Sequence, residues 1–500
     1  MGARPFTGLA PGGFSATLFG VNWHAALNQF WPHLAAGFYL AAGVLATGHT
    51  LLYKRDSRAA IIWITVIWTL PVAGPLLYLV LGVNRIRRRA LRLGVHKTHS
   101  RPVPENLGDT ENARAEHLQN IARVVSRIAT QPLLGGNHIE PLIAGDAAFP
   151  AMLAAIDAAK KSVTLCTYLF DNDAAGRSFV AALERAVRRG VAVRVLVDAA
   201  GTRYSWPPIT GKLRRAKIPF ATFLPASLLT PWHVATLNLR NHRKLLVVDG
   251  QTAFTGGINI RFGNLLAQKP KHPVQDLHFR VTGPVVAELQ EAFANDWAFA
   301  AGEELDGELW FPEIPETGEV IARVIMDGPD ADFEKARWTL LAALAEAQES
   351  VKIITPYFLP DYTLVTALNL AALRGVRVDL LLPAQNNLPF VQWASRAMWW
   401  QVLERGCHLW LTPAPFDHSK LMIVDGHWVL FGSANWDTRS LRLNFELNVE
   451  AYGSAFAATM DRIFAQKMAA AREVTQAEMD GRPLLIKLRD SIARLFSPYL

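Results

Sequence analysis

The chain has 500 residues, of which 51% are hydrophobic and 19% charged, and its formal net charge is +8. This length excludes a single ordinary domain and predicts two or three folded units. The mild positive charge excludes little, because it suits an anionic membrane surface and a nucleic acid equally well. The hydrophobic excess lies before residue 84, which indicates a membrane segment in front of a soluble body.

Residues 1–33 form an N-terminal extension for which the sequence offers no interpretation, and two apolar runs follow it. Residues 34–53 include His49 but no charged residue, and residues 59–83 include no charged residue. A helix needs roughly 20 apolar residues to cross a bilayer core of about 30 Å. We predict a transmembrane hairpin over 34–83, with Pro71 and Pro75 kinking its second helix. A signal peptide fits poorly because another apolar run follows at once, which leaves buried core helices as the alternative.

Residues 84–135 have the composition of a basic linker that ends in an amphipathic helix. Five arginines follow the second apolar run directly, at Arg85, Arg87, Arg88, Arg89 and Arg92. By the positive-inside rule these arginines place the C-terminal body in the cytoplasm, although they could also hold anionic lipid head groups. We therefore expect a multi-pass protein of the inner (plasma) membrane with a cytoplasmic body.

The two cysteines, Cys166 and Cys407, both stand beside apolar runs. A single disulfide between them is arithmetically possible, but we favour two buried thiols in a reducing compartment. Neither cysteine has metal-ligand spacing, and His233, His272 and His278 have none either. We expect no metal and no cofactor.

The body contains an internal duplication. An apolar strand over 161–168 is followed by a helical pattern and a second apolar strand over 190–198. The same order recurs with strands over 349–357 and 375–383. Strand, helix, glycine and strand is the pattern of a βαβ unit in a parallel or mixed sheet. We predict an α/β fold of two pseudo-symmetric α/β/α repeats, each with a mixed sheet.

We place the first repeat at 136–315 and the second at 316–500, and each carries the motif H-x-K-x4-D-x6-G-[GS]-x-N. The six positions of the motif are His242, Lys244, Asp249, Gly256, Gly257 and Asn259 in the first copy and His418, Lys420, Asp425, Gly432, Ser433 and Asn435 in the second. A lone histidine is more often an ordinary core or loop residue. Six fixed positions within 18 residues, repeated at equivalent places of a duplicated fold, make coincidence an inadequate explanation.

These residue types suit phosphodiester chemistry without a metal. Alternate residues of a strand share a face, so the His and Lys of each motif point the same way. If the repeats pack about a pseudo-twofold axis, the lysines and asparagines can bind the phosphate oxygens. One imidazole attacks phosphorus and the other protonates the leaving alkoxide. Asp249 and Asp425 belong to the same catalytic motif, but their odd spacing from the lysines predicts that they face away and hold a turn.

The duplicated motif resembles the HKD signature of the phospholipase D superfamily, and further segments resemble its bacterial cardiolipin synthases. Residues 240–244 and 256–259 carry the first motif of that family. Residues 355–361 read TPYFLPD, residues 437–446 read DTRSLRLNFE, and residues 75–85 read PLLYLVLGVNR. The resemblance implies a phosphatidyltransferase that joins two phosphatidylglycerols into cardiolipin and releases glycerol. It also implies membrane-embedded action on phospholipids and no nucleic-acid partner.

The superfamily resemblance further implies a crossed site. In such a site Glu446 orients His242, and Asp276 orients His418. By the same resemblance His242 is the nucleophile and His418 the acid and base. The chain departs from the family at Val274-Gln275, where a bulkier or basic pair is expected, and at Asn386-Asn387, where an acid is usual.

These departures leave the phosphoryl chemistry in place and several alternatives open. Within the same chemistry, the donor could be phosphatidylethanolamine, or the enzyme could be a hydrolase that makes phosphatidic acid. Remote alternatives are a membrane-tethered nuclease, which would show a larger basic surface, and a non-catalytic scaffold, which would have a broken motif. The aromatic stretches 225–232 and 390–400 could enter a membrane interface or pack on the sheet. The sequence does not predict the oligomeric state.

Overall fold

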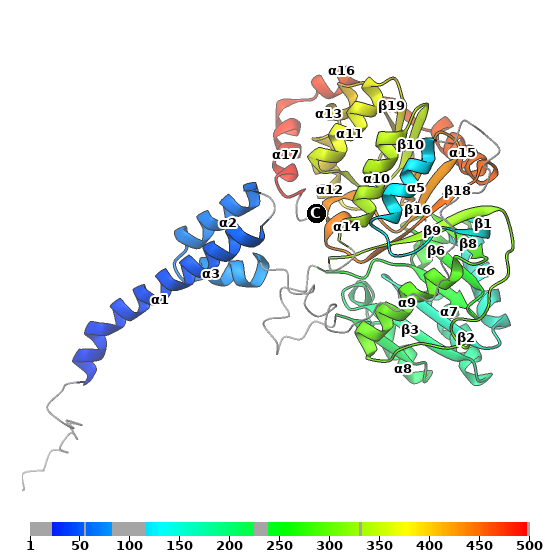
Figure 1. Ribbon diagram of the computed structural model, residues 1–500, viewed down its shortest axis with the longest axis horizontal. Coiled ribbons are helices and arrows are strands. Elements are labelled where there is room, and N and C mark those ends of the chain that lie inside the picture. The colour runs from blue at the N-terminus through cyan, green and yellow to red at the C-terminus, as the bar shows by residue number, and fades with distance from the viewer. Residues whose placement is uncertain (1–22, 55–56, 83–116, 225–238, 330–332, 498–500) are drawn as a thin grey trace, which may run out of the picture. The chain divides into compact units, whose positions relative to one another are not determined.

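The computed structural model describes the chain except for residues 1–22, 55–56, 83–116, 225–238, 330–332 and 498–500 (Figure 1). The chain divides into two compact units, Met1–Asn84 and Arg85–Leu500. Residues 1–22 of the predicted extension and most of the basic linker lie outside the described residues, whereas residues 23–33 of the extension belong to the first helix.

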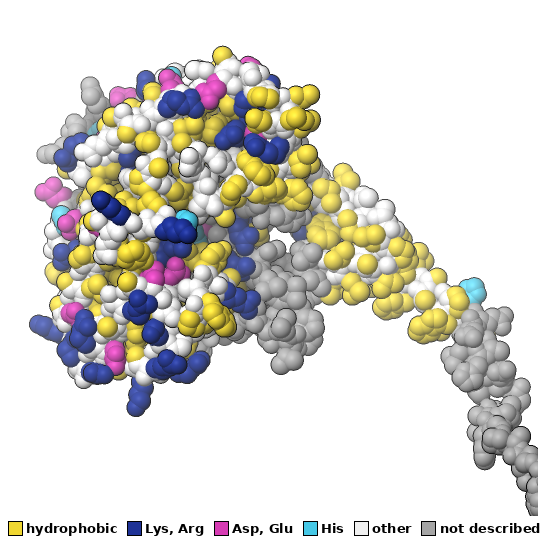
Figure 2. Space-filling model, turned by 180° about the vertical axis from the view of Figure 1, so that it is seen from behind, with side chains coloured by type: hydrophobic (Ala, Val, Ile, Leu, Met, Phe, Trp, Pro, Cys, Tyr) yellow, Lys and Arg dark blue, Asp and Glu magenta, His cyan; other side chains and the backbone are white. Residues whose placement is uncertain are grey.

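The described part of the first unit is helical and coated with hydrophobic side chains (Figure 2). It contains α1 (Trp23–Tyr53), α2 (Ser57–Thr69), α3 (Ala73–Leu77) and a π-helical turn η1 (Tyr78–Gly82). The indole of Trp68 donates to Thr47 Oγ1 at 3.0 Å, and the Tyr39 hydroxyl donates to the Trp68 carbonyl at 2.9 Å, so α2 lies against α1. Among the described residues, one helical segment, Phe30–Tyr53, is long and apolar enough to cross a membrane.

The second predicted span is not one helix. It breaks after Thr69, because Pro71 has no amide hydrogen to donate and Val72 adopts a φ of 65°. Helix α2 has 13 residues, which is about 20 Å at 1.5 Å per residue and short of a bilayer core. The structure therefore does not confirm a two-helix transmembrane hairpin.

The second unit is built on one sheet that runs through both repeats. In the described part of the chain this sheet has 15 strands, in the order β19-β13-β12-β10-β15-β16-β18-β9-β1-β8-β6-β5-β2-β3-β4. The strands of the first repeat are β1 (Leu134–Ile143), β2 (Ser162–Thr167), β3 (Ala192–Asp198), β4 (Phe220–Phe223), β5 (Leu245–Val248), β6 (Thr252–Gly256) and β8 (Leu277–Thr282). Those of the second are β9 (Val320–Asp327), β10 (Ser350–Ile354), β12 (Arg377–Pro383), β13 (His408–Thr412), β15 (Leu421–Val424), β16 (Trp428–Gly432), β18 (Glu446–Tyr452) and β19 (Arg472–Val474).

The strand order confirms the duplication. Counted outward from the central antiparallel pair β1 and β9, the first repeat runs β8-β6-β5-β2-β3-β4 and the second β18-β16-β15-β10-β12-β13, with β19 added at the edge. The predicted βαβ strands are β2 with β3 and β10 with β12, and each pair is parallel. The two repeats share a continuous sheet, where separate sheets were expected, because β1 and β9 satisfy each other's backbone groups.

Helices cover both faces of the sheet, which gives three layers. The principal helices are α6 (Ala144–Ala158), α7 (Ala174–Arg188), α9 (Val286–Ala301), α10 (Lys335–Glu346), α11 (Tyr362–Leu373) and α15 (Ser454–Ala469). On one face, α9 and α15 share a core that spans both repeats. On the other face, α6 and α7 cover the first repeat and α10 and α11 the second. Alternate side chains of β5 enter opposite cores, so the motif strand is buried on both sides.

Candidate active site

Each histidine and lysine of the duplicated motif stands just before a buried strand. His242 and Lys244 precede β5, and His418 and Lys420 precede β15. All four side chains are buried, with residue exposures of 8%, 2%, 9% and 5% in that order. Burial lowers the pKa of both histidines, and the charge of Lys420 lowers that of His242 further, as the charge of Lys244 lowers that of His418. Since each lysine acts on the histidine of the other motif, the two copies converge on one site.

Backbone hydrogen bonds hold each motif against the opposite repeat. The His242 amide donates to the Phe445 carbonyl at 2.9 Å, and the Phe445 amide donates to the Arg240 carbonyl at 2.8 Å. The His418 amide donates to the Gln275 carbonyl at 2.7 Å. Beside that contact, β14 (Phe416–Asp417) pairs with β7 (Val274–Gln275) in parallel. The site is therefore assembled from exchanged segments.

The carboxylates are exchanged in the same way. Glu446 Oε2 lies 2.9 Å from His242 Nδ1, and Asp276 Oδ2 lies 2.7 Å from His418 Nδ1. Each carboxylate belongs to the repeat that does not carry its histidine. A carboxylate on Nδ1 fixes the ring orientation and leaves Nε2 for chemistry.

The surroundings of the two carboxylates differ. Burial would raise the pKa of Glu446, but His242, Lys244 and a hydrogen bond from Ser433 lower it overall. The other carboxylate oxygen of Glu446 accepts from the side-chain amide of Asn444 at 3.0 Å. Burial raises the pKa of Asp276 to about 6, against the opposing effect of Lys420. Glu446 is therefore the more firmly ionised of the two.

The lysines are held inside the site and lose part of their basicity there. Burial lowers the pKa of Lys244 to about 7 and that of Lys420 to about 8, although Glu446 and Asp276 oppose this. Lys244 Nζ donates to the His242 carbonyl at 2.5 Å, and Lys420 Nζ donates to the His418 carbonyl. Both ammonium groups thus fold back on their own histidines and have donors left for an anion.

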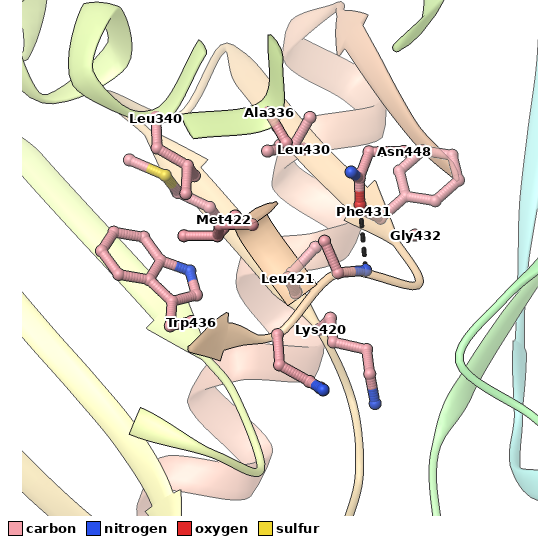
Figure 3. Close-up of a pocket in the computed structure, with 13 residues that line it drawn as sticks. Ala336, Leu340, Lys420, Leu421, Met422, Leu430, Phe431, Gly432, Trp436 and Asn448 are labelled. Carbon is pink, nitrogen blue, oxygen red and sulfur yellow. Dashed lines mark hydrogen bonds between the residues drawn. The ribbon is translucent and has the colours of Figure 1, made fainter. Parts of the chain in front are cut away.

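The two motif asparagines adopt different contacts. Asn259 Oδ1 accepts from the Leu169 amide at 3.1 Å, which leaves its NH₂ group for a ligand. Asn435 Nδ2 donates to Ser440 Oγ at 3.1 Å, and its buried Oδ1 has no hydrogen-bond partner within the described part of the chain. Beside Asn435 and Lys420 lies a small pocket whose lining is mostly apolar, including Met422 and Trp436 (Figure 3).

The structure places the motif aspartates away from the reacting groups. Asp249 accepts from the backbone amides of Lys160, Lys161 and Ser162, at 2.7 to 3.1 Å. Asp425 accepts likewise from the amides of Gln348, Glu349 and Ser350, at 2.7 to 2.9 Å. Both aspartates have a positive φ, 51° and 49°, at a strand turn. They fasten the turn after each motif strand to the start of a neighbouring strand.

Two tyrosines beside the histidines were not singled out as site residues from the sequence. The rings of Tyr168 and His242 lie 5.0 Å apart, and those of Tyr357 and His418 lie 5.9 Å apart. Burial raises the pKa of both tyrosines, so their hydroxyls stay protonated at neutral pH. Tyr168 directly follows β2, whereas Tyr357 lies three residues after β10, so no repeated spacing in the sequence points to this pair.

Two arginines also stand close to the first motif. The Arg240 carbonyl accepts from the backbone amide of Phe445. The Arg439 carbonyl accepts from the backbone amide of Asn444, the residue before Phe445, at 3.0 Å. Burial lowers the pKa of Arg439, and the positive charge of Arg240 lowers it further. The spacing of Arg240, two residues before His242, was the available signal.

The positions where the chain departs from the family also border the site. The Gln275 carbonyl holds the His418 amide, a contact that is independent of side-chain identity. Asn387 Oδ1 accepts from the Tyr357 hydroxyl at 2.9 Å, and Asn386 Nδ2 donates to the Pro356 carbonyl at 2.9 Å. The Asn pair thus positions a tyrosine that packs on His418.

The other histidines and the cysteines that the structure describes are not among the reacting groups of the site. Among the described residues, no group of three or more His, Cys, Asp or Glu side chains could hold a metal ion. Cys166 and Cys407 are buried free thiols, as predicted. Burial lowers the pKa of His278 to about 4, so this side chain is neutral. His233 lies outside the described residues.

Comparisons with known proteins agree with this architecture. A family described as "Cardiolipin synthase, PLD-like domain" matches residues 152–297 and 340–468, and a family described as "Phospholipase_D-nuclease N-terminal" matches residues 41–82. The chain is 34% identical to cardiolipin synthase A of Pseudomonas fluorescens, over 95% of this chain and 100% of that protein. It is 31% identical to the major cardiolipin synthase ClsA of Bacillus subtilis, over 89% and 95%.

A solved structure resembles the body in fold. Phosphatidylserine synthase of Haemophilus influenzae aligns with a TM-score of 0.61 at 14% identity. The alignment covers 76% of this chain and 100% of that one.

Proposed function

The chain belongs to the phospholipase D-like cardiolipin synthases and is a phosphatidyltransferase, and from this premise we propose that it joins two phosphatidylglycerols into cardiolipin. The observation that carries the proposal is the pair of buried, crossed His–carboxylate contacts between two lysines. Such a site binds one phosphodiester, supplies a nucleophile on one side and supplies a proton on the other.

In the first step, Nε2 of one histidine attacks the phosphorus of the donor lipid. The phosphorus–oxygen bond to the glycerol head group breaks, and the other histidine donates its proton to the departing alkoxide. In the second step, that histidine removes the proton from a hydroxyl of the second phosphatidylglycerol. The hydroxyl oxygen attacks phosphorus, the phosphorus–nitrogen bond breaks, and cardiolipin leaves. Lys244 and Lys420 neutralise the non-bridging oxygens in both steps.

We assign His242 as the nucleophile. Glu446, the more firmly ionised carboxylate, holds the Nδ1–H tautomer, and this tautomer leaves the lone pair on Nε2. His418 then serves as acid and base. Burial and both lysines lower the pKa of His418. A bound phosphodiester anion offsets the charge of those lysines and favours the protonated imidazole that the first step needs.

A transferase must also hold its acceptor, and the acceptor here carries a phosphate of its own. Arg240 and Arg439 provide two neighbouring positive charges beside Tyr168 and the first motif. We assign them to the acceptor phosphate, because two neighbouring guanidinium groups suit a phosphate. Water has no such group, so this contact favours transfer over hydrolysis.

Membrane association follows from the family and from the apolar helix Phe30–Tyr53. We propose that the body lies on the cytoplasmic side, because the arginines of residues 85–92 follow the apolar unit in the sequence. The number of membrane crossings stays a prediction, since α2 alone is too short for a full span.

The test is to reconstitute the full chain in phosphatidylglycerol vesicles and identify the products by mass spectrometry. We expect cardiolipin and free glycerol, and a loss of at least roughly three orders of magnitude in turnover for His242→Ala. Phosphatidic acid alone would make the enzyme a hydrolase, and a requirement for phosphatidylethanolamine would change the donor. Either result would overturn the proposal.

A separate test addresses the roles of the histidines. A phosphatidyl ester of p-nitrophenol has a leaving group that needs no proton. With this donor, His418→Ala should release a burst of p-nitrophenol and retain a phosphatidyl adduct on His242, because the base for the second step is missing. His242→Ala should give neither. An adduct on His418 instead would reverse the assignment.

A further inference from the structure

The C-terminal helix α17 (Leu484–Arg494) presents its apolar side outward. Leu485, Leu488, Ile492 and Leu495, the last just beyond the helix, follow each other at spacings of three and four residues and therefore form one stripe. Their exposed fractions are 79%, 49%, 57% and 72%. A helix on a soluble body ordinarily buries such a stripe.

The buried side of α17 carries one acidic and one small apolar side chain, Asp490 and Ala493. Asp490 is fully buried and accepts from Arg482 at 2.9 Å and from Arg489 at 2.6 Å. The Arg489 guanidinium also lies 4.5 Å from the ring of Trp393, in α12 (Pro389–Arg396), against which α17 packs. The cation–π contact and the burial of Ala493 in the hydrophobic core therefore fix the helix to the body, and the ion pairs satisfy Asp490 within its own segment. The orientation is specified by these contacts and leaves the apolar stripe outside.

Cationic side chains border the stripe. Lys487 and Arg494 project from one side of the helix and Arg489 from the other. Phe496 extends the apolar stripe past the helix end, is half exposed, and lies 5.6 Å from the ring of Phe390. Figure 2 shows hydrophobic and basic side chains interspersed over this region of the body. Leucine and aromatic groups edged by Lys and Arg are the composition of a helix that lies in a membrane interface.

We propose that α17 docks the body onto an anionic bilayer surface, with its leucine stripe among the upper acyl chains and its basic side chains at the lipid phosphates. This contact is additional to the N-terminal apolar unit and does not depend on the reaction assigned to the active site. The charge pattern favours lipid over a second copy of the chain, because two copies of this face would bring like charges together. The contact would hold the body beside the layer that contains its lipid substrates.

The test uses the full chain with a polarity-sensitive fluorophore on Leu488→Cys, reconstituted in vesicles that contain phosphatidylglycerol. Ile492→Cys gives a second position on the stripe, and Leu309→Cys, an exposed leucine of the first repeat, is the matched control. The native cysteines are buried, so labelling is directed to the new thiol. Quenchers are attached either to lipid chains or to a water-soluble carrier.

We expect lipid-borne quenchers to reduce the emission at residues 488 and 492 at least several-fold more than at residue 309. Replacing the anionic lipid by phosphatidylcholine should weaken this difference. Equal quenching at all three positions would overturn the proposal. Protection at residue 488 from both kinds of quencher would also overturn it, because the stripe would then be covered by protein.

A functional measurement complements the fluorescence. Leu485→Glu combined with Leu488→Glu should raise the lipid surface concentration needed for half-maximal rate several-fold and leave kcat in detergent micelles unchanged. Leu309→Glu should change neither. Equal loss in vesicles and in micelles would indicate a defect in the site and would contradict a docking role.

Discussion

At the scale of single residues, the site depends on charged side chains that are buried. Burial brings the pKa of Lys244 to about 7 and that of Asp276 to about 6, so both groups titrate close to neutrality. Asp276 must be ionised to orient His418, and its ionisation is lost as pH falls below about 6. Lys244 must be protonated to bind phosphate, and its proton is lost as pH rises above about 7.

We therefore expect a bell-shaped dependence of kcat/KM on pH, because this ratio reports the free enzyme. The kcat profile should extend further to the alkaline side, because a bound anion raises the pKa of both lysines. The measurement is initial rate over a range from about pH 5 to about pH 9. The Asp276→Asn variant should have a lower kcat/KM at every pH, and its kcat/KM should not fall further at low pH. A kcat/KM that is flat over the whole range would contradict this account.

A second residue-scale prediction concerns Arg240. Arg240→Ala should raise the ratio of phosphatidic acid to cardiolipin, because water then meets less competition from the acceptor lipid. The expected change is at least about tenfold, the size of a lost contact between two charged groups. The matched control is Arg462→Ala, a change on helix α15 outside the site. An unchanged product ratio with a reduced total rate would indicate that Arg240 stabilises the fold or binds the donor lipid.

The sequence predicts much of the site at this scale, for a clear physical reason. His242 and Lys244 alternate just before strand β5, and the repeat of that spacing at His418 identifies the second copy. The contributions of Ser433 and Tyr168 are not predictable in the same way. Their places depend on how strand ends from different repeats meet, and no local spacing encodes that arrangement.

At the scale of elements, the motif aspartates fasten turns. Asp249→Ala leaves three backbone amides without their acceptor, which costs about 1–3 kcal/mol in the folded state. We expect a melting temperature lower by a few degrees, with turnover of the folded protein largely retained. Circular dichroism and activity of the same detergent-solubilised sample measure both.

The comparison for that variant is Asp157→Ala, which removes a half-exposed ion pair with Arg185. Such surface pairs contribute little, so the melting temperature should hardly change. A thousandfold loss of turnover in Asp249→Ala with unchanged melting would instead give the aspartate a chemical role. The same reasoning applies to Asp425, which additionally accepts from His117 Nε2 at 2.7 Å.

The second predicted span shows where element prediction fails. Hydropathy over 59–83 measures composition, and the composition is apolar throughout. It does not register that Pro71 removes one amide donor or that Val72 takes a left-handed backbone, and these two features end α2 at Thr69. The βαβ strands were predicted well because their burial depends on the side chains themselves.

At the scale of the whole molecule, the repeats exchange the groups that orient their histidines. A change in one repeat should therefore impair the chemistry of the other. In a His418→Ala background, Glu446→Gln should slow the p-nitrophenol burst, because it loosens His242 in the first repeat. Glu473→Gln, an exposed carboxylate of the same repeat, is the control. An unaltered burst rate would show that His242 does not need Glu446.

The continuous sheet has a consequence for engineering. The obvious crossover point for recombining this chain with a relative is the loop between α9 and β9, because this loop joins the two repeats. A crossover there would draw every histidine and its carboxylate from different parents, together with the backbone contacts at Phe445 and Gln275. Active chimeras should be recovered instead from exchanges that inherit residues 240–244 with 443–446, and residues 274–276 with 416–420, as linked blocks. The segments that meet at the interface between the repeats must therefore come from the same parent.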